Sequence, residues 1–206
     1  MGLFNRQESE KKNLDRLTRG ADRVAAMLMG TLRGPQGVDL KFPLLYASGL
    51  AGYACRQAVK ALGGHVAVIT TKDDKTYYYG EAVNKYLMED HLSVLSFVNA
   101  VSNLKEEQVA GIAVEMTNSL GSDRFNIWGM TPESVYPKIK ECWDGIYNNM
   151  TANYCKDPSE WPMLFGITTQ MIILKAIEAG AGAEEAGLMA MQCAYVISKM
   201  DDDSLL

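Results

Sequence analysis

The chain has 206 residues, of which 48% are hydrophobic and 22% are charged, and its formal net charge at pH 7 is −5. These values are typical of one folded globular unit and exclude intrinsic disorder along most of the chain. Residues 1–41 hold eight Lys or Arg against five Asp or Glu, whereas the remainder holds twelve against twenty. Because an acidic surface repels phosphate, nucleic-acid binding is disfavoured unless the first helix alone provides it.

The cysteines and the first residues indicate the compartment. The four cysteines lie far apart without a CxxC pair, and the chain opens with charged residues instead of an apolar leader. We therefore expect reduced thiols in a cytoplasmic protein. The least polar stretch, 161–177, is interrupted by polar residues and is shorter than the about 20 apolar residues that a membrane span needs. We expect no association with a membrane.

Two helices are expected before the first change of pattern. Residues 7–32 carry apolar side chains at spacings of three and four, which predicts a long amphipathic helix. The Gly- and Pro-containing cluster at 34–37 ends it, and a second helix is expected over about 43–62. The small residues Ala47, Gly49, Ala51, Gly52 and Ala54 cluster in this second helix. Such a bare backbone suits the close approach of another helix, so we expect helix 43–62 to be central.

The sequence then predicts one β-hairpin over about 65–80. Two runs of β-branched and aromatic residues, 65–71 and 75–80, are joined by Lys72-Asp73-Asp74. After Gly80, Glu81 opens a short helix that ends near Met88, with its carboxylate where the helix dipole favours negative charge.

From residue 92 onward we expect helices only, near 92–102, 104–120, 137–150, 162–179 and 183–200. Asn103, with Glu106 three residues later, predicts a capping box. In two segments a second proline follows a first, and it would break a helix begun there. We expect a capped single turn at the first proline and a long helix from the second. These pairs are Pro132 with Pro137 and Pro158 with Pro162.

Together these elements predict a mainly α fold with one inserted β-hairpin (α+β). We expect a single compact domain, 1–206, of about seven to eight helices, with a helical body over 81–200 and a frayed acidic tail over 201–206. The last two helices are apolar on every side, which places them at the heart of the core.

The common catalytic and metal-binding motifs are absent from the sequence. The chain contains no phosphate-binding glycine loop and no serine-nucleophile motif, and its two histidines, His65 and His91, lack metal-ligand spacing. No metal and no cofactor are expected. One nucleophilic pair is conceivable, Cys55 with His65, if the fold brings them together. The alternative interpretation is that Cys55 is a small buried hydrophobe.

Three consecutive tyrosines are the most distinctive feature of the hairpin. Alternation along a strand sends Tyr77 and Tyr79 to one face and Tyr78 to the other. One hypothesis is an aromatic platform for a ligand or partner. The alternative is that two tyrosines pack on helices while their hydroxyls reach water.

The leading functional hypothesis is a self-associating interaction module without catalytic activity. Two strands alone are marginal in water, so the hairpin must lean on helices or extend its sheet across a partner, and a homodimer would form a shared four-stranded sheet. The alternative is a small-molecule-binding protein or enzyme with a pocket between the hairpin and helix 43–62. Its candidate lining residues are Cys55, His65, Tyr77, Tyr79 and Glu81. Nucleic-acid binding through the first helix ranks last.

Overall fold

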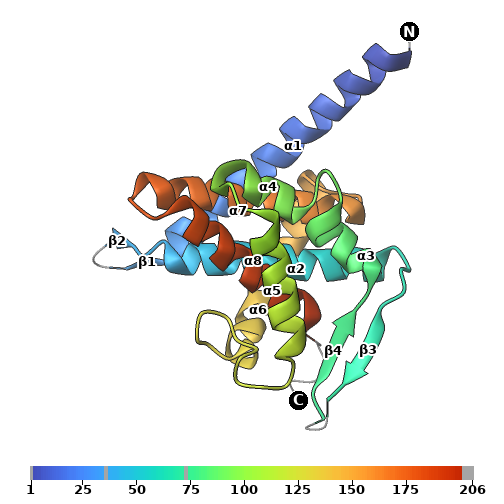
Figure 1. Ribbon diagram of the computed structural model, residues 1–206. Helices are drawn as coiled ribbons and strands as arrows, with labels where there is room; N and C mark the ends of the chain where they lie inside the picture. Colours follow the sequence, from blue (N-terminus) through green and yellow to red (C-terminus); the bar gives the residue numbers. More distant parts are fainter. Residues whose placement is uncertain (1, 35–36, 72–73, 201–206) are drawn as a thin grey trace.

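The computed structural model describes residues 2–34, 37–71 and 74–200, and the side chains of 11–32, 39–71 and 74–200. It confirms a mainly α fold with an inserted β-hairpin (Figure 1). The helices are α1 (Gly2–Thr31), α2 (Lys41–Ala61), α3 (Glu81–Asn84), α4 (Val94–Ser102), α5 (Glu106–Asn118), α6 (Pro132–Asn153), α7 (Trp161–Glu178) and α8 (Ala183–Lys199). The strands are β1 (Arg33–Gly34), β2 (Gly37–Val38), β3 (Ala67–Thr70) and β4 (Thr76–Tyr79).

The hairpin forms where the sequence predicts it. β3 and β4 are antiparallel, with Val68 opposite Tyr78 and Ile69 opposite Tyr77. A second antiparallel pair, β1 with β2, was not predicted, and it occupies the glycine-containing cluster that ends α1. The predicted turn at Lys72-Asp73 and the predicted frayed tail, 201–206, lie outside the described residues.

The second helix is central, as its small residues predict. α2 packs most extensively against α7 and α8, and Ala47, Ala51 and Ala54 are completely buried. At Gly52 the neighbouring helix comes so close that a Cβ atom would lie 2.0 Å from the carbonyl oxygen of Ala194 in α8. Only glycine leaves room for this contact.

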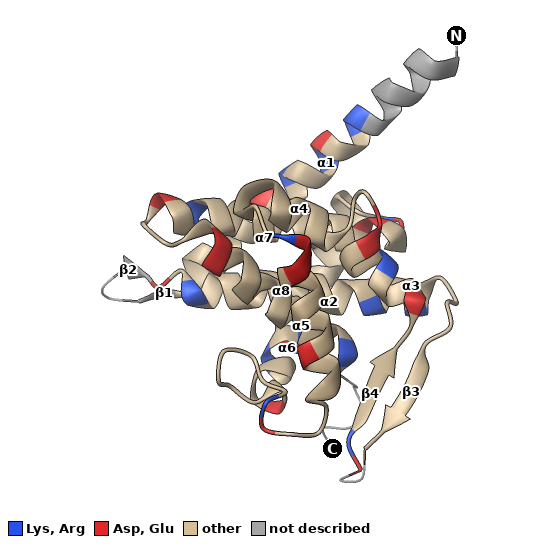
Figure 2. Ribbon diagram, in the orientation of Figure 1, with Lys and Arg blue, Asp and Glu red and all other residues tan. Residues whose placement is uncertain are grey.

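The first helix packs against the helical body through its C-terminal half. Its buried residues include Leu17, Ala21 and Val24, and α7 is its main neighbour. Its N-terminal turns project from the helical body (Figure 1). Basic and acidic residues are interspersed along the part of α1 whose side chains are described, with five Lys or Arg against two Asp over 11–32 (Figure 2).

The prediction that Pro137 begins a new helix is wrong. α6 runs without interruption from Pro132 to Asn153, with Pro137 on its exposed side. Pro137 has no N–H to donate to the Glu133 carbonyl one turn earlier, and on this exposed side water can bond that carbonyl instead. Packing compensates for the lost bond, because Trp143 of α6 stacks with aromatic side chains of α7, with ring centroids 5.5 Å apart for Phe165. The second proline pair behaves as predicted, with a 3-10 turn at Pro158–Glu160 followed by α7.

The predicted capping box at Asn103 and Glu106 is also wrong. Asn103 instead ends α4 in a left-handed conformation, φ 53°, which asparagine tolerates better than most residues. α5 begins three residues later, and Gln108 supplies the cap by accepting a 2.8 Å hydrogen bond from the Lys105 backbone N–H. Asparagine is favoured both before the first turn of a helix and after its last turn, and the sequence did not distinguish these two positions for Asn103.

We predict that Gly52→Ala destabilises the protein by about 3 kcal/mol, because the added methyl would overlap the Ala194 carbonyl of α8. The matched control is Gly145→Ala in α6, where a Cβ meets nothing within 4 Å. That change should stabilise the protein by about 0.5–1 kcal/mol, since alanine favours helix. Urea unfolding measures both, and equal stabilities of the two variants would contradict the close packing.

Candidate functional site

Strand β4 is buried at Tyr77 and half-buried elsewhere, whereas β3 is exposed and lies outside it (Figure 1). Tyr77 is 2% exposed and packs edge-on against Phe125, with ring centroids 5.2 Å apart. On the side away from β3, Tyr77 forms an isolated antiparallel bridge with Met200. The inner strand is therefore fixed to the body by its rings and by its backbone.

Tyr78 is held against α2 by two cations. Arg56 is completely buried, and its guanidinium lies 5.5 Å from the centre of the Tyr78 ring. Lys60, one turn later, places Nζ 5.1 Å from the same ring. The guanidinium also lies against the rings of Tyr53 and Tyr136, and it donates a hydrogen bond to the Tyr136 hydroxyl. Side chains of the chain itself thus occupy the contact between the hairpin and α2.

A second buried cation holds Tyr79. Lys199, the last residue of α8, is completely buried, and its Nζ lies 4.6 Å from the Tyr79 ring and 4.7 Å from the Tyr195 ring. It donates a 3.0 Å hydrogen bond to Oδ1 of Asn84 in α3. Burial lowers the pKa of Lys199 to about 8, against a smaller opposing effect of Cys55. One ammonium group therefore joins β4, α3 and α8.

Of the other predicted site residues, Cys55 lies apart from His65 and Glu81, which flank the same end of the hairpin. Cys55 is completely buried in α2, where burial raises its thiol pKa, whereas His65 and Glu81 are exposed. A nucleophilic cysteine needs an accessible thiolate, and burial of this kind keeps the thiol protonated. The environment of Cys55 thus fits the small-hydrophobe interpretation. The tyrosines gather around buried cations, but His65 and Glu81 face the solvent.

The sequence analysis did not single out Arg56 and Lys199. The available signal was a cationic residue in a mostly apolar segment, Arg56 in 43–62 and Lys199 at the end of 183–200. A long cationic side chain at such a position can still reach water, so the pattern alone does not predict burial.

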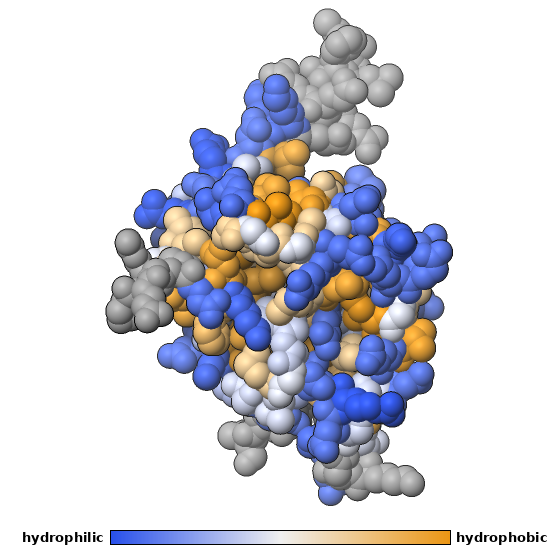
Figure 3. Space-filling view, turned by 60° about the vertical axis from the view of Figure 1, so that its left-hand side comes forward, coloured by the Kyte–Doolittle hydropathy of each residue, from blue (hydrophilic) through white to orange (hydrophobic). Residues whose placement is uncertain are grey.

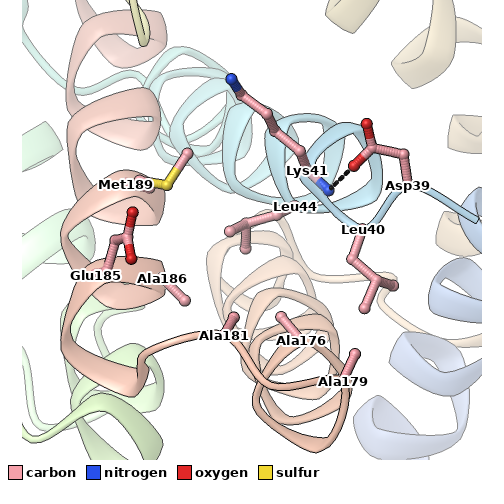
Figure 4. A pocket seen from close by; sticks show the side chains of 10 residues that line it. All are labelled: Asp39, Leu40, Lys41, Leu44, Ala176, Ala179, Ala181, Glu185, Ala186 and Met189. Carbon is pink, nitrogen blue, oxygen red and sulfur yellow. Dashed lines mark hydrogen bonds between the residues drawn. The ribbon is translucent and has the colours of Figure 1, made fainter.

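A cleft lies elsewhere, between the start of α2, the end of α7 and the start of α8, with a volume of about 480 Å³. Alanines and Leu44 line its floor, and Glu185 and Met189 of α8 face Asp39 and Leu40 across it (Figure 4). Asp39 accepts a 3.1 Å hydrogen bond from the backbone N–H of Lys41, the first residue of α2. The Lys41 ammonium is directed away from the cleft.

The described residues contain neither a cluster of metal ligands nor a helix that could span a membrane. No group of three or more His, Cys, Asp or Glu side chains there could hold a metal ion. No described helix is both long enough and apolar enough to cross a bilayer.

Comparisons with known proteins add no identification: no family model, no curated protein and no solved structure matches the chain.

We predict that Lys199→Met stabilises the protein near pH 7. The native pKa, about 8, lies below the ordinary value of 10.5, so the ammonium form penalises the native state below pH 8. This penalty disappears as the pH rises from about 8 to about 10.5. Methionine retains the apolar stem without the charge, so we expect a gain of about 1–3 kcal/mol near pH 7 that shrinks near pH 10.

Urea unfolding of the parent and the variant at both pH values measures this effect, because ionisation of other groups cancels in the difference. Lys85→Met is the matched control: Lys85 is exposed, so removing its solvated ammonium should change stability little. A variant less stable than the parent near pH 7 would show that the cation–aromatic contacts outweigh the cost of burying the charge.

We predict that one thiol per native chain reacts slowly with Ellman's reagent near pH 8, and that all four react after denaturation. Cys55, Cys155 and Cys193 are buried, whereas Cys142 is partly exposed. Its pKa is raised to about 11 by burial and by the Glu141 carboxylate, so little of it is thiolate at that pH. Fast reaction of any thiol would reveal a reactive cysteine. A Cys142→Ser variant without a native reaction identifies the residue.

Proposed function

We propose that this protein is a self-associating interaction module that pairs with a second copy through the outer edge of β3. Within the described residues, β3 pairs only with β4, and all four of its residues are exposed. Val68 is 58% and Ile69 is 43% exposed. The open edge and these two apolar side chains are the observations that carry the proposal, because such an edge presents unpaired N–H and C=O groups to another strand.

The composition of β3 supports strand pairing. Ala67–Thr70 contains no lysine, no other charged residue and no proline, which are the residues that commonly protect an edge from association. A two-fold axis perpendicular to the sheet would place Val68, or Ile69, opposite its own counterpart. β-branched pairs of this kind stabilise antiparallel strands.

The way β4 is anchored supports a preformed edge. An isolated two-stranded hairpin is marginal in water. Here Arg56 and Lys60 hold one face of β4, Lys199 holds the other, and Met200 bridges its inner edge. Because β4 is held in place, β3 is already ordered before it pairs with a second copy, and less conformational entropy is lost on association.

The proposal involves no catalytic group, and the buried Cys55 thiol is a poor nucleophile. A small-molecule site between the hairpin and α2 is less favoured, because Tyr78, Arg56 and Lys60 already contact each other there.

We predict a weak dimer whose population rises with concentration, since four residues per copy give a small interface. Val68→Lys should leave the protein monomeric, because a lysine on an edge strand opposes its pairing with another strand. Val114→Lys in α5 is the matched control: Val114 is 59% exposed, close to the 58% of Val68, and should leave association unchanged. Sedimentation velocity over about two decades of micromolar concentration measures all three proteins.

A parent that stays monomeric throughout this range contradicts the proposal. So does a Val68→Lys variant that dimerises as well as the parent. Circular dichroism spectra of the two variants establish that both retain the helical fold.

A further inference from the structure

A second groove runs beside the cleft at α2, between α5 and α8, with a volume of about 730 Å³. The two hollows share Glu185 and Met189 of α8, so they adjoin at this helix, and we term the pair the α8 groove. Figure 3, with the β1–β2 side brought forward, shows apolar surface framed by hydrophilic residues on this side of the molecule.

The charges around the groove have mostly one sign. Its part between α5 and α8 is lined by Glu115, Glu184 and Glu185 and by no basic residue. The adjoining cleft adds Asp39 and Lys41, and the Lys41 ammonium points away from it, 5.9 Å from the centre of the Trp128 ring. Such a rim attracts a cationic partner and repels phosphate groups.

The floor of the groove is apolar and adaptable. Ile112 and Met116 of α5 face Leu188 and Met189 of α8 across it. Methionine side chains adjust to partners of different shape, which suits the apolar anchors of a bound helix.

Gly111 leaves the wall of the groove open. It lies in the middle of α5, where glycine costs about 0.5–1 kcal/mol relative to alanine. A Cβ at this position would meet nothing within 4 Å, so no packing within the described chain requires the glycine. At the wall of a groove, however, a glycine lets another backbone approach closely.

From these observations we infer that the α8 groove binds a basic amphipathic helix of a partner protein. Its apolar residues would lie on the methionine- and leucine-lined floor, and its Lys or Arg residues would reach the three glutamates of the rim. This binding is separate from the pairing of β3, because none of the groove residues belongs to the hairpin.

The test uses a fluorescein-labelled amphipathic peptide of leucine and lysine, about 14 residues and therefore about four helical turns long. Fluorescence anisotropy should show saturable binding to the full chain, and a peptide with glutamate in place of lysine should not bind. Glu185→Lys, at the junction of the two hollows, and Gly111→Gln, which fills the wall, should each raise Kd by at least about tenfold. Gly111→Gln should also stabilise α5, so a loss of binding would not reflect misfolding.

Two matched controls separate the groove from general attraction. Asp144→Lys, exposed in α6, makes the same charge change as Glu185→Lys, and Gly145→Gln changes another helical glycine with open space above it. Both should leave Kd within about twofold of the parent. An equal loss in the controls, or unchanged affinity in Gly111→Gln, overturns the inference, as does absence of binding to the parent.

The Val68→Lys variant separates the two proposals. It should bind the lysine peptide as the parent does, because the groove lies outside the hairpin. Failure of peptide binding in a parent that still dimerises overturns only the groove. Failure of dimerisation with intact peptide binding overturns only the pairing of β3.

Discussion

The structure depends on the close contact between α2 and α8 at Gly52, where a Cβ would lie 2.0 Å from the Ala194 carbonyl oxygen. This approach encloses α2 between α7 and α8, so residues one turn further along α2 are also enclosed. Arg56 is one of them, and its charge has to be accommodated inside the protein. The tyrosines of α2, α6 and the hairpin surround it, since aromatic faces attract cations most strongly where water is absent. The position of the hairpin therefore follows from a helix contact that lies outside it.

Two buried cations, Arg56 and Lys199, hold successive tyrosines of β4 on its two faces. This is a costly way to fix a strand, because each cation loses its hydration, and the lowered pKa of Lys199 reports that cost. The arrangement also explains the unequal exposure of the strands. The anchoring groups described above act on β4, so β3 is attached mainly through its ladder with β4, and its four residues stay exposed.

The two proposed surfaces differ in their chemistry. The edge of β3 would bind through backbone groups and is self-complementary, so a second copy is its natural partner. The α8 groove is acidic with an apolar floor, and it has no matching surface on its own face. A basic helix from another protein suits it better than a symmetric copy. A protein with both surfaces would present two grooves in each dimer, and a bivalent partner would gain from their proximity.

The sequence by itself determined the helices, the hairpin and the central position of the second helix, because local periodicity and small residues encode them. It did not determine that α6 continues through Pro137, since that depends on packing of Trp143 against residues of α7 that are distant along the chain. For the site, it identified the tyrosines and their alternation, but not the cations that hold them. Burial of Arg56 and Lys199, exposure of β3 and the meeting of α5 with α8 were decided only by the tertiary structure. Each is produced by contacts between segments far apart in sequence, which no local pattern records.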